Sequence, residues 1–248
     1  MHFNLLARNR KSTVIATFFI LFFTWILTSS FQGKDRVSAS MESRKLFDGK
    51  VVIVKAQIYY TFDEGKMIMN YTYPNKHVFI SNALGEAKVY YPERNEVSVL
   101  QNTMFSTEND VLYYFMSGQI DDLGLRSLGF QLAETDFDDN LMVTTWMPPG
   151  TIAGRLSKIE MVHENYIPIY SAYYTGDNKV QKKIYYSDFL RHDNVVIPQK
   201  VTEIEFLAKG DSIISRKEYS DFKFGASAMG DYFNFKVPED AKIIDLKK

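Results

Sequence analysis

The chain contains no cysteine among its 248 residues. This absence excludes disulfide bonds, thiol nucleophiles, zinc–thiolate sites and iron–sulfur clusters. It also removes the residue that a bacterial lipoprotein needs just after its apolar leader in order to carry an acyl anchor. The fold must therefore be stabilised by its core, and a chain of this size buries roughly 70% of the surface that it exposes when unfolded.

The chain also lacks an excess of charge of either sign. Its 29 basic and 30 acidic residues give a formal net charge of −1, and no run of basic residues tracks along the sequence. Proteins that bind nucleic acid need such a basic stripe to neutralise phosphates. We therefore expect no nucleic-acid partner.

Patterns typical of catalysis or of cofactor binding are scarce. The four histidines are scattered, and we expect His163 and His192 to be solvated or singly hydrogen-bonded rather than metal ligands. Residues 225–230 resemble a nucleophile elbow but lack the glycine two positions after the serine. Residues 136–140 form an acidic stretch that we expect to be a polar loop, and it lacks the spacing of a calcium loop. We expect no catalytic residue, no cofactor and no metal.

The beginning of the chain has the pattern of an export signal. Arg8, Arg10 and Lys11 precede an unbroken apolar run over residues 14–27. This run suits the apolar region of a signal peptide and is short of the ~20 residues of a membrane-spanning helix. We expect three segments: a signal peptide over residues 1–30, a polar segment over residues 31–45 and one folded periplasmic domain over residues 46–248. The alternative is an uncleaved inner-membrane anchor through residues 14–31.

Large, soft apolar side chains are abundant, with 19 Phe, 16 Tyr and 10 Met. Most of them are expected to be ordinary core residues. Methionine and aromatic side chains also line adaptable apolar binding surfaces, because they fill irregular shapes. The composition is thus compatible with an apolar binding cavity.

Alternation of apolar and polar residues between turn signals predicts a mostly antiparallel β-sheet. Along residues 67–73, for example, Met69, Tyr71 and Tyr73 fall on one face, and Ile68 falls on the other. The ranges that we expect to form strands are 51–62, 67–73, 77–81, 87–91, 96–100, 141–146, 158–163, 169–174, 180–189, 195–207, 212–222 and 231–237.

Two short helices are expected between the strand groups. Thr107 and Asp110 have the spacing of an N-terminal cap, and apolar residues at one-face helical spacing follow through residue 117. A second helix is expected over residues 121–129, because Asp121 and Asp122 would place negative charge at its positive end.

Three stretches of the sequence resemble the LolA-type family of periplasmic lipoprotein carriers. The motif Tyr-Thr-Tyr-Pro-Asn-Lys at residues 71–76, with the strand-turn-strand that follows to residue 93, resembles the early strands of that family. Residues 185–201 resemble its later strands, and residues 232–241 resemble its last strand. The resemblance implies a mainly β fold with short helices (α+β), in which a curved antiparallel sheet forms an unclosed half-barrel with a helical lid.

The resemblance also implies a task and a set of partners. Such a carrier binds the acyl chains of lipoproteins or related lipids in an apolar concavity and delivers them toward the outer membrane. Its partners would be the acylated cargo, an inner-membrane exporter and an outer-membrane acceptor, each contacted transiently, and the carrier itself would be a monomer. Eight residues are the candidates for the lipid-binding face and the lid: Met69, Tyr71, Tyr73, Phe79, Leu112, Phe115, Leu123 and Leu128.

The chain departs from the family at Tyr73. The carriers have an arginine at this position, where it fastens the lid, so aromatic packing would have to replace that latch here. The amphipathic helix that precedes the first strand in the family would correspond at best to residues 41–47.

Two other functions remain open. A sensor or scaffold module of the same fold would bind a protein partner through the rim of the sheet rather than through its concavity. An envelope hydrolase with paired carboxylates is the enzymatic alternative.

Overall fold

The computed structural model of the protein describes residues 36–102, 106–107, 110–193, 195–207 and 210–245. The expected signal peptide and anchor lie outside the described residues. No helix within these ranges is long and apolar enough to cross a membrane.

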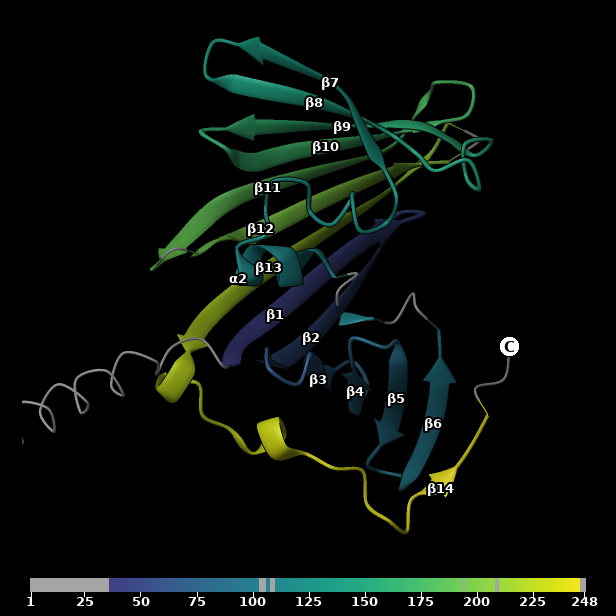
Figure 1. Cartoon of the computed structure of the whole chain (residues 1–248). Helices are drawn as coiled ribbons and strands as arrows, with labels where there is room; N and C mark the ends of the chain where they lie inside the picture. The colour runs from purple at the N-terminus through teal and green to yellow at the C-terminus, as the bar shows by residue number, and fades with distance from the viewer. Residues whose placement is uncertain (1–35, 103–105, 108–109, 194, 208–209, 246–248) are drawn as a thin grey trace, which may run out of the picture.

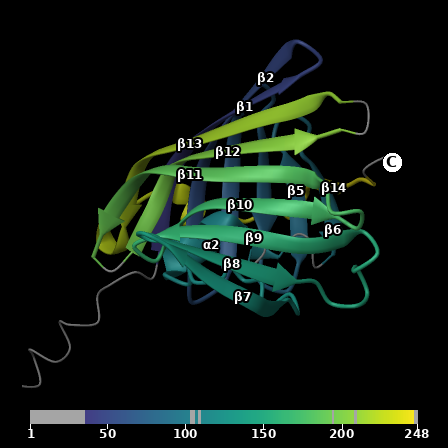
Figure 2. The same cartoon turned by 90° about the horizontal axis from the view of Figure 1, so that it is seen from above.

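A single curved sheet of fourteen strands forms the body of the molecule (Figures 1 and 2). Its order is β14-β6-β5-β4-β3-β2-β1-β13-β12-β11-β10-β9-β8-β7, and neighbours are antiparallel except for the parallel pair β14 and β6. The two edge strands do not pair with each other, so the sheet is an unclosed half-barrel, as the sequence predicts. The strands are β1 (Arg36–Phe47), β2 (Lys50–Thr61), β3 (Lys66–Tyr73), β4 (His77–Ser81), β5 (Glu86–Tyr91), β6 (Glu96–Gln101), β7 (Gln131–Asp138), β8 (Leu141–Met147), β9 (Leu156–Glu164), β10 (Ile167–Thr175), β11 (Val180–His192), β12 (Val195–Phe206), β13 (Ser212–Phe224) and β14 (Lys242–Ile243).

The α-helix of the described ranges, α2 (Val111–Ser117), lies inside the curve of the sheet (Figure 1). Its cap is Asp110, whose carboxylate accepts a 2.8 Å hydrogen bond from the backbone N–H of Leu112, and not Thr107. The Thr107 hydroxyl instead donates to the carbonyl of Gly65. The first expected helix is therefore confirmed, but it begins later than the sequence indicates.

The second expected helix, over residues 121–129, is wrong. This segment consists of bends and turns, in which Leu123, Gly124 and Gly129 have φ values of 45°, 81° and 85°. These left-handed conformations interrupt a right-handed helix. The apolar side chains of the segment still face the sheet, so it covers the sheet without being helical. We call residues 118–130 the cover segment.

The amphipathic helix expected within residues 41–47 is also wrong. These residues belong to β1, which pairs with β2 along its whole length and with β13 on its other side. A two-residue turn, Asp48 and Gly49, connects β1 to β2, and both residues have positive φ. This is the turn geometry that a tight hairpin requires. The sheet thus begins at Arg36, inside the stretch expected to be a polar segment.

Asp136 and Asp138 lie in β7, an edge strand, and not in the expected polar loop. Only the last part of that stretch is a turn, where Asp139 adopts a φ of 50°. All residues of β7 are exposed, so the strand carries no apolar alternation that would have identified it.

The last expected strand, residues 231–237, is wrong as well. β13 already has β1 and β12 as neighbours, so no edge is available beside it. The chain instead forms two short 3₁₀ turns, Gly225–Ser227 and Asp231–Asn234, and crosses the outer face of the sheet (Figure 1). There Tyr232 and Phe233 pack on Tyr59.

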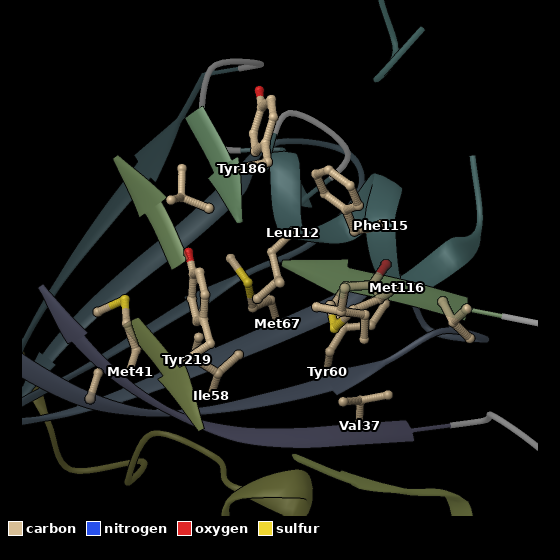
Figure 3. Packing of buried hydrophobic residues seen from close by; sticks show 14 of the residues in the cluster. Val37, Met41, Ile58, Tyr60, Met67, Leu112, Phe115, Met116, Tyr186 and Tyr219 are labelled. Carbon is tan, nitrogen blue, oxygen red and sulfur yellow. The ribbon is translucent and has the colours of Figure 1, made fainter. Parts of the chain in front are cut away.

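The largest apolar cluster lies between α2 and the concave face. Leu112, Phe115 and Met116 of the helix are buried against residues of β1, β2, β3, β11, β12 and β13. Figure 3 shows Leu112 and Met116 directed toward Met67 and Tyr60. A second cluster joins Leu125 and Phe130 of the cover segment to Trp146 of β8 and to Ile159 and Met161 of β9.

Candidate functional site

A cavity of about 560 Å³ lies on the concave face, between the sheet and the elements that cover it. This volume is within the ~300–1,000 Å³ range of small-molecule sites. The cover contributes Val111 and Tyr114 of α2 and Leu123, Leu125 and Leu128 of the cover segment. The sheet contributes apolar or aromatic side chains from four strands: Met161, Tyr173, Ile184, Tyr186 and Val201.

One end of the cavity is polar. Glu203 of β12 and Ser215 and Lys217 of β13 line it, together with Asp110 at the start of α2. Val201 is directly opposite Lys217, and Glu203 is directly opposite Ser215, so all four side chains point to the same face. Within the described part of the chain, Lys217 has no carboxylate at ion-pair distance. The cavity is therefore amphipathic, with an apolar body and a charged end.

Two tyrosine hydroxyls of the cavity, those of Tyr173 and Tyr186, stay neutral. Burial raises the pKa of Tyr173 to about 12. Burial also raises the pKa of Tyr186 far above its usual range, and a hydrogen bond with Ser171 offsets only part of this effect. Neutral hydroxyls keep the walls uncharged, as the lining of an apolar ligand requires.

His163 of β9 lies beneath the cover segment and is fully buried. The expectation of a solvated side chain is therefore wrong. Neither imidazole nitrogen has a partner of good hydrogen-bond geometry among the described residues, and the nearest polar groups are backbone groups. Burial lowers its pKa, although the nearby backbone of Asp121, Met142 and Ile120 acts in the opposite direction. A neutral histidine thus packs against the backbone of the cover segment at Ile120 and Asp121.

The eight candidate residues fall into three groups. Leu123 and Leu128 line the cavity. Leu112 and Phe115 are buried in the largest cluster, and Met69 and Tyr71 pack against it, so these four belong to the core beside the cavity. Phe79 lies on the same face as Met69, which is its partner in the sheet register, and Tyr73 is 51% exposed at the end of β3.

Sequence reasoning missed most of the cavity wall that the sheet provides. The missed side chains alternate along their strands: Ile184 with Tyr186, Val201 with Glu203, and Ser215 with Lys217. This alternation identifies one face of each strand, but it does not say which part of that face stays uncovered. The positions of α2 and the cover segment determine which part of the face lines the cavity. The turns of the cover segment set its position, and the helical spacing of its sequence does not predict them.

No group of three or more histidine, aspartate or glutamate residues among the described residues could hold a metal ion. The charged groups that line the cavity are a lysine and two carboxylates, and no histidine lines it. The arrangement can bind an amphiphile through apolar contacts and one charged end.

No sequence family matches the chain, and no curated protein matches it by sequence. Solved structures match its fold. A LolA superfamily protein from Nitrosomonas europaea superposes with a TM-score of 0.53 at 14% identity, covering 82% of this chain and 91% of that one. A DUF1329 family protein from Desulfovibrio piger has a TM-score of 0.55 at 13% identity, covering 81% and 89%.

A domain from Vibrio parahaemolyticus, described as an outer membrane lipoprotein-sorting protein domain, has a TM-score of 0.53 at 12% identity and covers 81% of this chain and 89% of its own. The protein therefore has the LolA-like fold, and the resemblance noted in the sequence is confirmed at the level of the fold. At these identities the likeness concerns the fold alone.

Proposed function

We propose that the protein is a non-enzymatic carrier of acyl chains, which it takes from lipoproteins or related lipids and holds in the cavity under the cover segment. The single observation that carries this proposal is the cavity itself, about 560 Å³ in volume and walled by aliphatic and aromatic side chains. The LolA-like fold supports the same reading.

The energetics of an acyl chain explain why a carrier needs such a cavity. Each methylene that leaves an apolar environment for water costs about 0.8 kcal/mol, so a fourteen-carbon chain would lose on the order of 11 kcal/mol. A cavity that shields the chain from water removes this cost. The cover segment would close over the cargo and open for its release as one unit, because most of its backbone hydrogen bonds, such as those from Leu125 to Asp122 and from Phe130 to Leu125, are made within the segment itself.

The proposal includes a location and partners. The chain would be exported by residues 1–30, act in the periplasm as a monomer, receive cargo from an inner-membrane exporter and deliver it to an outer-membrane acceptor. The basic stretch and apolar run at the start of the sequence support export. These residues lie outside the described part of the chain.

Binding of a fluorescent fatty acid, together with native mass spectrometry of protein taken from the envelope, tests the proposal. We expect saturable binding and co-purified acyl species. Leu128→Asp places a charge in the cavity wall and should abolish binding, whereas Leu84→Asp, at an exposed turn away from the cavity, should leave it unchanged. A protein that neither holds lipid from its envelope nor binds the fatty acid is not a carrier.

A sensor or scaffold function is the second candidate, and the free edge of β7 favours it. β7 ends the sheet, all of its residues are exposed, and Glu134, Asp136 and Asp138 occupy alternating positions. An extended, basic segment of a partner protein could add a strand there. Leu128→Asp separates the two functions, because it should abolish carriage and spare binding at the edge.

A further inference from the structure

The hairpin that joins β1 and β2 ends in apolar side chains that no other element covers. Val51 is 60% exposed and Phe47 is 48% exposed, and Leu46 and Val52 beside them are also exposed. Figure 2 shows this hairpin projecting beyond the rest of the sheet. We call Lys45, Leu46, Phe47, Lys50, Val51 and Val52 the β1–β2 tip.

Both faces of the tip carry apolar side chains, and one of them also carries charge. Leu46 is directly opposite Val51, so these two side chains share the outer face. Phe47 and Val52, one position along in each strand, project from the other face, together with the two lysines of the tip that are directly opposite them. A strand that packs on a core has one apolar and one polar face. A projecting hairpin with exposed apolar side chains on both faces instead indicates a tip that enters an apolar phase.

The apolar surface continues onto neighbouring strands. Leu46 pairs with Ile214 of β13, and Ile214 pairs with Ile204 of β12, so an apolar row crosses the outer face. Phe206 follows on β12, and the Lys183 ammonium lies 6.0 Å from its ring centroid. Exposed apolar patches of this kind mark interaction sites.

The tip is basic, although the whole chain is not. Residues 44–55 hold four basic residues and one acidic residue, a net charge of +3, in a chain whose formal net charge is −1. Arg44 and Lys55 are paired with Glu42. Within the described ranges, Lys45 and Lys50 have no such carboxylate partner. Two unpaired ammonium groups therefore flank the apolar side chains.

From this combination we infer that the β1–β2 tip docks the protein on an anionic lipid bilayer. Apolar side chains that insert at the headgroup boundary, together with lysines that reach the anionic headgroups, are the two components of interfacial membrane binding.

The tip also adjoins the cavity. Lys45 is directly opposite Ser215, which lines the polar end of the cavity, and such pairs lie ~5 Å apart between their Cα atoms. Docking would therefore hold the charged end of the cavity against the membrane. The inference goes beyond the proposed function, and it stands whether or not the cavity carries acyl chains.

Vesicle binding tests the inference. The probes are vesicles of phosphatidylcholine alone and of phosphatidylcholine mixed with phosphatidylglycerol. We expect binding to the mixed vesicles only, and a loss of about 30-fold in affinity for the double variant Lys45→Ala with Lys50→Ala, because each basic side chain near an anionic surface contributes a factor of about five. Phe47→Ser with Val51→Ser should also weaken binding.

The control is a double variant at the far edge of the sheet, Leu132→Ser with Phe137→Ser, which removes two exposed apolar side chains of β7 and should bind as the wild type does. All variants and the wild type are compared in the same processed form, as isolated from the envelope, so the segment before β1 is identical in all of them. Equal vesicle binding by the tip variants and the wild type would overturn the inference. The absence of any vesicle binding would also overturn it and would indicate that the tip binds a protein partner.

A second measurement does not depend on removing tip side chains. Because the chain has no cysteine, Val51→Cys provides a single site for an environment-sensitive fluorophore. We expect a blue shift on addition of the mixed vesicles, and none with the label at Phe137→Cys. An unshifted label at residue 51 contradicts docking by the tip. Fatty-acid binding, measured on the same proteins, reports separately on the proposed function.

Discussion

The ring of Tyr114 occupies the space beside Gly124 where any other residue would carry its Cβ atom. A Cβ at position 124 would lie 2.0 Å from the Cζ of Tyr114. Gly124 also has a φ of 81°, so two independent constraints favour glycine. This contact joins α2 to the cover segment at the wall of the cavity.

Gly124→Ala should therefore displace the cover segment. We expect a loss of more than ~1–2 kcal/mol in the free energy of unfolding, the cost of a left-handed alanine, because the clash with Tyr114 adds to it. Denaturant unfolding measures the loss. Gly118→Ala is the control, since φ there is 74° but nothing lies within 4 Å of the added Cβ. Equal losses for the two variants would show that the Tyr114 contact is unimportant.

Truncation of Phe115 should reduce stability, whereas truncation of Leu128 should reduce ligand binding. Phe115 is 0% exposed, so Phe115→Ala should cost ~3–5 kcal/mol in the free energy of unfolding. Leu128 is 52% exposed and lines the cavity, so Leu128→Ala should change stability little and weaken binding of a fluorescent fatty acid. The pair separates the core from the site, and a large stability loss at Leu128 would contradict that separation.

Asp110 caps α2, and its removal should loosen the cover. Asp110→Ala should lower the free energy of unfolding by ~1 kcal/mol, because the backbone N–H of Leu112 loses its acceptor. Asp110→Asn keeps an acceptor oxygen and should restore most of the stability. Thermal or denaturant unfolding of both variants measures the effect. If the asparagine variant is as unstable as the alanine variant, the negative charge of Asp110 stabilises the protein, and its capping hydrogen bond does not.

His163 should make stability depend on pH. Burial lowers its pKa below the 6.5 of a free histidine. The unfolded chain therefore takes up a proton as the pH falls through about 6.5, while the folded protein stays neutral until a lower pH. The free energy of unfolding should fall over that window and be independent of this group above it.

The variant His163→Leu checks this expectation. Its free energy of unfolding, measured against pH with denaturant, should lack the decrease that the wild type shows below about pH 6.5. The protection of the amides of Ile120 and Asp121 from hydrogen exchange, corrected for the intrinsic effect of pH, should fall for the wild type at the low end of the window and not for the variant. Parallel curves for the two proteins would contradict a role for His163.

The strands were predictable because each has a face against the core. All of the expected strands except the last are present, with ends shifted by at most three residues. β1 was missed even though it is followed by Asp48-Gly49, a dipeptide that is typical of tight hairpin turns. Its polar composition hid the alternation of Val37, Ala39 and Met41, which are buried.

The site was less predictable, because it depends on backbone conformations that have weak sequence signals. Residues 121–129 have helical spacing, but Leu123 has a positive φ and packs against both apolar clusters, a conformation that no local pattern in the sequence signals. β7 has no buried face, so no periodicity could identify it. Of the eight candidates, the two leucines of the cover segment line the cavity. Four others belong to the core or pack against it, and Tyr73 is exposed.

The position of β1 between β2 and β13 affects how the protein folds. Met41 is paired with Tyr219, so the middle of the sheet joins strands from opposite ends of the described chain. Contacts of such long sequence separation form slowly, because a large loop must close first. The chain can complete its sheet only after almost all of it has been synthesised.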